Sequence, residues 1–225
     1  MNQFRLISFS LLICTLIFQA CSDKDDNQDS TELLVLKPNA EEGVDAVIWT
    51  ERPDIGSPDA KDFQAMGWTW YAQSYNGGIR RSLIDFNLES IPEEAKIINA
   101  TLKLFHNPTS AEIPSTMGHS QRDGSNRSIL SRVVSAWSED NVTWNNQPAI
   151  STDNQVFVKA SDAINEDYEI DVKDLVEDMI QNPSESAGFM YMLQNEEYYR
   201  AMIFASSDHE NSDLHPELEI EYKLR

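Results

Sequence analysis

Residues 217–224 read Glu-Leu-Glu-Ile-Glu-Tyr-Lys-Leu, and this stretch gives the clearest indication of the fold. Leu218, Ile220, Tyr222 and Leu224 alternate with charged residues, so an extended segment here has one apolar and one charged face. Such alternation predicts a β-strand with one face on the core and the other in water.

Similar patterns, separated by turn-forming residues, recur along the chain and predict further strands. With the last one, the predicted strands are Val44 to Thr50, Arg80 to Leu88, Ile97 to His106, Ile129 to Ala136, Gln155 to Ala160, Tyr168 to Val172, Phe189 to Gln194, Ala201 to Ser206 and Glu217 to Lys223.

One helix is predicted between Val172 and Gln181, because apolar residues recur there at helical spacing. Asp171 can cap its first turn, and Asn182-Pro183 would end it. Nine short strands, one helix and no internal repeat favour an all-β fold, a β-sandwich of the jelly-roll kind. Its expected core contains Leu83, Ile84, Phe86, Leu102, Leu104, Val133, Trp137, Trp144, Leu175, Phe189, Phe204 and Leu218.

The N-terminus predicts export and lipidation. Arg5 precedes a short apolar run that ends at Ala20-Cys21, and a small residue before cysteine is typical of a lipoprotein signal peptide. An uncleaved membrane helix is disfavoured, because the run is shorter than the ~20 apolar residues that a bilayer requires. Residues 1–20 are therefore predicted to be removed, and Cys21 to carry lipid, palmitate included.

The mature chain is predicted to be a protein of the cell envelope. It begins with the lipidated Cys21, continues as an acidic tether through residue 31, and ends in a single domain over residues 32–225. The tether has no apolar residue between Ser22 and Thr31, which predicts disorder. Its acids resemble surface-export signals, so we expect the domain on the outer face of the outer membrane. Contact with membrane is expected through the lipid alone.

The charge balance restricts the partners. The sequence has 38 Asp and Glu against 17 Lys and Arg, a net charge of −21, which repels nucleic acid. The predicted mature domain has no thiol for a disulfide, and its four histidines lack zinc-ligand spacing. Nucleophile-elbow and phosphate-loop motifs are also absent from the sequence, so no enzyme class is indicated.

Two segments could bind ligands. Trp68 and Trp70 fall on one side of an extended segment, where their rings and Tyr71 could stack on sugars, with Arg80 and Arg81 as polar partners; the alternative places both tryptophans in the core. The loop 206–213 is rich in oxygen ligands for a structural calcium ion, or is simply a polar turn. The residues predicted to hold calcium are Asp208, Glu210, Asn211 and Asp213.

Four segments in order resemble the DNRLRE domains, also classified as carbohydrate-binding module family 96. They are Arg80 to Leu104, the corner Trp137 to Pro148, the stretch from Tyr168 to Phe189, and the closing segment Phe204 to Leu218. The resemblance implies an exported β-sandwich that binds polysaccharide without cleaving it. The net charge fits poorly with the acidic polysaccharide alginate, which founding members bind.

The function expected from these features is a surface-exposed, non-catalytic, polysaccharide-binding lipoprotein that assists glycan capture or degradation. Two alternatives stay open at this point. One is a structural or adhesive protein of the same fold with a protein partner, and the other is an enzyme that cleaves polysaccharide.

Overall fold

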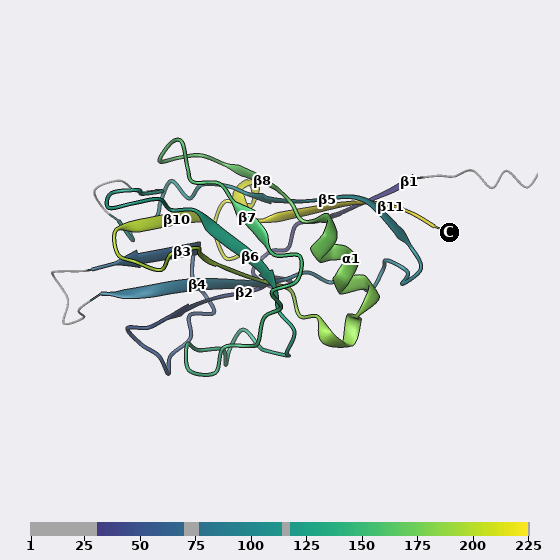
Figure 1. Cartoon of the computed structure of the whole chain (residues 1–225), viewed down its shortest axis with the longest axis horizontal. Helices are drawn as coiled ribbons and strands as arrows, with labels where there is room; N and C mark the ends of the chain where they lie inside the picture. Colours follow the sequence, from purple (N-terminus) through teal and green to yellow (C-terminus); the bar gives the residue numbers. More distant parts are fainter. Residues whose placement is uncertain (1–30, 70–76, 114–117, 225) are drawn as a thin grey trace, which may run out of the picture.

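The computed structural model describes residues 31–69, 77–113 and 118–224, which form two β-sheets packed face to face (Figure 1). Every strand pair within these residues is antiparallel. The all-β sandwich predicted from the sequence is confirmed.

The smaller sheet has four strands, in the order β1 (Thr31–Leu36), β11 (Glu217–Lys223), β5 (Lys96–Leu104) and β8 (Tyr168–Asp171). The larger sheet has the order β10 (Arg200–Ala205), β3 (Asp62–Trp68), β4 (Gly78–Asp85), β9 (Phe189–Leu193), β6 (Ser128–Arg132) and β7 (Val156–Val158). Its seventh strand, β2 (Val44–Trp49), pairs with β4 along its length, from Asp85 back to Arg80.

Strand β4 organises the larger sheet. One edge pairs with β2, while the other pairs with β3 at its beginning and with β9 near its end. Its side chains alternate between two apolar layers. Ile84 packs in the main core between the sheets, whereas Leu83 belongs to a second cluster.

The predicted core is divided between these two layers. Eight of the twelve predicted residues lie in the main core, while Leu83, Val133, Trp137 and Trp144 belong to the second cluster. This cluster forms because the segment that follows β6 brings Trp137 and Trp144 against residues of β2, β4 and β9. The sandwich therefore has an additional apolar layer that strand alternation alone did not predict.

The predicted helix is α1 (Lys173–Gln181), which packs against β5 and β6 and lies at one end of the sandwich (Figure 1). Leu175, Val176, Met179 and Ile180 are buried, as the helical spacing predicts. The predicted cap at Asp171 is wrong, because the N-cap residue is Val172 and no side chain caps the helix. Asp171 instead lies one residue earlier, where its Oδ1 accepts from the backbone N–H of Lys173 at 3.0 Å.

Two short 3₁₀ helices complete the described elements. They are η1 (Pro183–Glu185), directly after α1, and η2 (Ser212–Leu214), before β11. Within the described ranges, no helix is both long and apolar enough to cross a bilayer.

Candidate functional site

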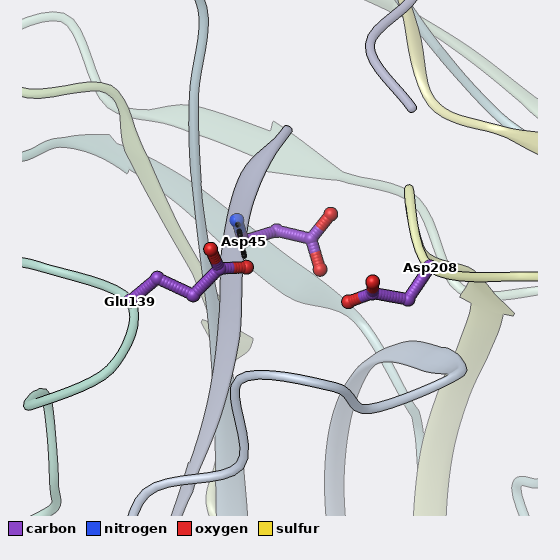
Figure 2. Close-up of side chains that lie close together, drawn as sticks. All are labelled: Asp45, Glu139 and Asp208. Carbon is purple, nitrogen blue, oxygen red and sulfur yellow. Dashed lines mark hydrogen bonds between the residues drawn. The ribbon is translucent and has the colours of Figure 1, made fainter. Parts of the chain in front are cut away.

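Three carboxylates that are distant in the sequence converge beside strand β2. Asp45 is the second residue of β2, Glu139 lies in the corner between β6 and β7, and Asp208 follows β10. One carboxylate oxygen from each lies within 4.8 Å of the others, and Figure 2 shows the carboxylates of Asp45 and Asp208 directed toward one another. We call this group the carboxylate triad.

Hydrogen bonds fix two members of the carboxylate triad relative to the backbone. The N–H of Asp45 donates to Glu139 Oε1 at 3.3 Å, and Asp45 Oδ2 accepts from the N–H of Ser207 at 2.9 Å. The chain therefore holds the three segments in place through short-range polar contacts, and the side-chain charges are left facing one another (Figure 2).

Burial makes these carboxylates costly to ionise. Removal from water is the main cause that raises the pKa of Asp45 to about 6 and that of Glu139 to about 7, and it also raises the pKa of Asp208. The negative charge of Asp208 adds to the increases at Asp45 and Glu139. At Asp208 itself the repelling charge is Asp59, and the cation Lys61 acts against the increase. A cation bound among the three carboxylates would offset both the loss of hydration and the repulsion between negative charges.

One oxygen of the triad has no donor. Asp208 Oδ2 is shielded from solvent and accepts no hydrogen bond from any described residue. A buried carboxylate oxygen without a partner loses its hydration and gains nothing in return. Hard cations such as calcium bind six to eight oxygen ligands, so three carboxylates with backbone carbonyls and water could form such a site.

The calcium ligands predicted from loop composition are separated in the structure. Asp208 joins the triad, whereas Glu210, Asn211 and Asp213 are exposed residues outside it. Asn211 instead caps η2, because its Oδ1 accepts from the N–H of Asp213 at 3.2 Å. Sequence reasoning missed Asp45 and Glu139, although an isolated aspartate among the apolar residues of a strand was a usable signal.

The predicted aromatic site is only partly described. Trp68 ends β3 with 8% of its surface exposed, and its ring packs edge-on against Tyr199 with centroids 5.2 Å apart. A ring buried in this way has little surface for stacking on a sugar. Trp70 and Tyr71 lie outside the described residues, so their part in the site stays a prediction.

Arg80 is buried in a polar network. Its Nη1 lies 2.6 Å from Glu112 Oε2, its Nε lies 3.5 Å from Glu51 Oε1, and its guanidinium lies over the ring of Trp49 at 4.8 Å. Because this cation already has acidic and aromatic neighbours, it is poorly placed to contact a polymer in solution.

Arg81 is half-buried on the opposite face of β4. It forms a bidentate contact with Glu196, donating from Nε at 2.7 Å and from Nη2 at 2.8 Å, and it donates from Nη1 to Gln147 Oε1. Its guanidinium also stacks over Trp144 at 4.5 Å. These contacts indicate that Arg81 attaches the Trp144 corner to the sheet.

A groove of about 620 Å³ lies between the end of β4, the loop after it and the end of α1. We call it the β4–α1 groove. Its apolar lining consists of buried Phe86, Ile91, Met179 and Ile180, half-buried Val44 and Leu88, and exposed Pro183. Carboxylate, amide and hydroxyl side chains complete the lining, from Glu42, Asp85, Asn87, Glu89, Glu93 and Ser186.

The volume of the groove falls within the range of ligand-binding pockets in proteins. The sequence pattern of carbohydrate-binding module family 96 matches residues 68–222, which is more than half of the chain. The chain therefore belongs to this family, and the DNRLRE resemblance is confirmed. No curated protein matches the chain significantly. The matched region includes Glu139 and Asp208 but begins after Asp45.

Proposed function

We propose that the chain is a non-catalytic polysaccharide-binding lipoprotein, displayed on the outer face of the cell envelope through lipid on Cys21. Membership of carbohydrate-binding module family 96 carries the proposal, because it indicates a carbohydrate partner for the domain that holds the groove. The anchor and the surface location rest on the sequence of the first 31 residues, where Cys21 follows a short apolar run and precedes an acidic segment. Binding without cleavage fits an accessory role in glycan capture or degradation.

The β4–α1 groove is the proposed binding surface. Sugars present apolar C–H faces and hydroxyl groups together, so they fit a surface that combines apolar side chains with hydrogen-bond acceptors. Leu88 and Pro183 provide accessible apolar surface, while Asn87 and Glu89 provide polar atoms from the loop after β4. A volume of about 620 Å³ is within the range of small-molecule sites and suits a few sugar units of a longer chain.

Trp68, the described tryptophan of the predicted aromatic site, pairs with Gly78 at the other end of β4. Gly78 begins β4 on that side and Asp85 ends it at the groove, so the two surfaces are separated by roughly 23 Å of extended chain. Substitutions at one surface should therefore leave the other unchanged, and this separation allows a direct test.

The test uses the full-length protein in detergent micelles and a panel of soluble polysaccharides. Glu89→Ala with Glu93→Ala should lower the affinity for the bound glycan at least tenfold, while Glu210→Ala with Asp213→Ala should not. All four positions are exposed, so the melting temperature should stay close to that of the wild type. Loss of binding in Trp70→Ala instead, with normal melting, would contradict the assignment to the groove.

We also propose a structural calcium ion at the carboxylate triad. The buried, unpartnered Oδ2 of Asp208 among two further carboxylates favours this, since a divalent cation would satisfy it and neutralise the buried charge. The ion would connect β2, the Trp137–Pro148 corner and the loop after β10, three segments that are far apart in sequence. It would stabilise the fold without contacting the sugar.

Calcium removal tests this second proposal. A chelator should lower the melting temperature of the wild type by several degrees, and excess calcium should restore it, because a ligand of the folded state stabilises by mass action. Asp208→Asn should abolish this calcium response, while the exposed control Asp213→Asn should retain it. An unchanged wild-type melting curve in chelator would contradict the proposal.

A further inference from the structure

The charges in the β4–α1 groove are all of one sign. Four carboxylates line it: Glu42 from the turn before β2, Asp85 from the end of β4, and Glu89 and Glu93 from the loop after β4. None of the described residues that line the groove is a lysine, arginine or histidine. A ligand that enters it therefore meets negatively charged side chains and no positively charged one among the described lining residues.

These carboxylates differ from those acids on the sandwich that have a basic partner. Glu217 and Glu219 both pair with Lys103, and Glu196 pairs with Arg81. Within the described residues, by contrast, no salt bridge involves any of the four groove carboxylates. The groove therefore has negative charge that the protein itself does not neutralise.

Asp85 is the least exposed of the four groove carboxylates. It ends β4 and is half-buried, and its Oδ1 accepts from the N–H of the next residue, Phe86, at 2.9 Å. Burial raises the pKa of this carboxyl, which shows that its environment penalises the negative charge. A positively charged group in the groove would remove that penalty.

We propose that the groove selects polysaccharides with free amino groups, that is, chains of de-N-acetylated amino sugars. This rests on the proposed carbohydrate-binding function and adds the substrate class. Protonated amines would contact the carboxylates of Asp85, Glu89 and Glu93. The C–H faces of the sugar rings would pack on the accessible apolar surface of Leu88 and Pro183. Uronate and sulfated chains would be repelled, and N-acetylated chains would lose the charge contacts.

The net charge of −21 attracts any polycation, so a test must distinguish binding in the groove from this non-specific attraction. The separation uses two pairs of charge-neutralising substitutions of equal size. Glu89→Gln with Glu93→Gln changes the groove, and Glu210→Gln with Asp213→Asn changes an exposed region outside it by the same two charges.

The experiment is calorimetric titration of the full-length protein in detergent micelles at physiological salt and mildly acidic pH. The ligands are a glucosamine oligomer, its N-acetylated counterpart of equal length, a uronate oligomer and the polyamine spermidine. The glucosamine oligomer should bind at least tenfold more tightly than its acetylated counterpart, and the uronate oligomer should not bind. The groove pair should abolish the tenfold preference, while the control pair should preserve it.

The outcomes separate this inference from the proposed function. Equal or tighter binding of the acetylated oligomer, weakened by the groove pair, would overturn the amino-sugar class and leave carbohydrate binding intact. Binding of spermidine as tightly as the oligomer would overturn recognition of the sugar ring in the groove. Failure of every oligosaccharide, together with failure on the wider glycan panel, would overturn both proposals.

Discussion

Asp45 shows at the residue scale how this fold concentrates charge. It belongs to a strand whose other residues are mostly apolar, and only 2% of its surface is exposed. A buried aspartate is unfavourable unless it is paired, and here two acids, Glu139 and Asp208, lie beside it. The position therefore favours either a bound proton or a bound cation.

The pH dependence of stability should distinguish these two states. Without divalent cations, the folded protein binds protons at Asp45 and Glu139 more tightly than the unfolded chain, because their pKa values are raised to about 6 and about 7. The free energy of unfolding should therefore fall as pH rises from about 4 to 7. Chemical denaturation in chelator at a series of pH values measures this change.

Two comparisons make the pH experiment decisive. Saturating calcium should remove most of the decrease in the free energy of unfolding with pH, because the cation replaces the protons. In chelator, Asp208→Asn should make this decrease smaller, because it removes one of the repelling charges. A free energy of unfolding that rises with pH over this range in chelator would contradict the raised pKa values.

At the scale of elements, helix α1 closes one end of the sandwich and forms one wall of the β4–α1 groove. Leu175 and Val176 are fully buried in the main core, whereas Met179 and Ile180 are buried residues that also line the groove. The helix thus connects the stability of the core to the shape of the proposed binding surface.

Truncation of Leu175 to alanine should destabilise the protein by about 2 to 5 kcal/mol, because it removes a fully buried side chain from the core. Truncation of the exposed residue Gln181 at the end of the same helix should change stability by less than about 0.5 kcal/mol. Urea denaturation of both variants measures the difference. Similar stabilities for the two variants would show that α1 does not pack as described.

Two strands, β3 and β1, were not predicted from the sequence, and each was missed for a different physical reason. Residues 62–68 form β3, and all seven are buried: Phe63 packs in the main core, and Met66 and Trp68 pack in a separate cluster. A strand covered on both faces has no alternating pattern to detect. Strand β1 was missed for the opposite reason, since four of its six residues are exposed.

The candidate sites were less predictable than the strands. Asp208 could be selected from the oxygen-rich loop after β10, but its partners Asp45 and Glu139 are 163 and 69 residues away in the sequence. The groove likewise depends on the meeting of Met179 with the loop around Glu89. Such contacts follow from strand order and helix docking, which local patterns do not determine.

At the scale of the whole molecule, the proposed lipid on Cys21 would attach an acidic sandwich to the membrane by a short tether. Cys21→Ala should release the protein from the membrane fraction into the soluble fraction, with its melting temperature unchanged, because Cys21 precedes the first described strand. Fractionation followed by thermal melting tests this. A variant that stays in the membrane fraction would contradict anchoring through Cys21 alone.

The proposed function, polysaccharide binding without cleavage, can be tested on the whole protein. The most direct measurement incubates the purified full-length protein with a panel of acetylated, deacetylated, neutral and acidic polysaccharides, and records both binding and new chain ends. We predict saturable binding of a glycan that Glu89→Ala with Glu93→Ala weakens at least tenfold, with no increase in reducing or unsaturated ends. Absence of binding across the panel, or release of new chain ends by the wild type, would contradict the account.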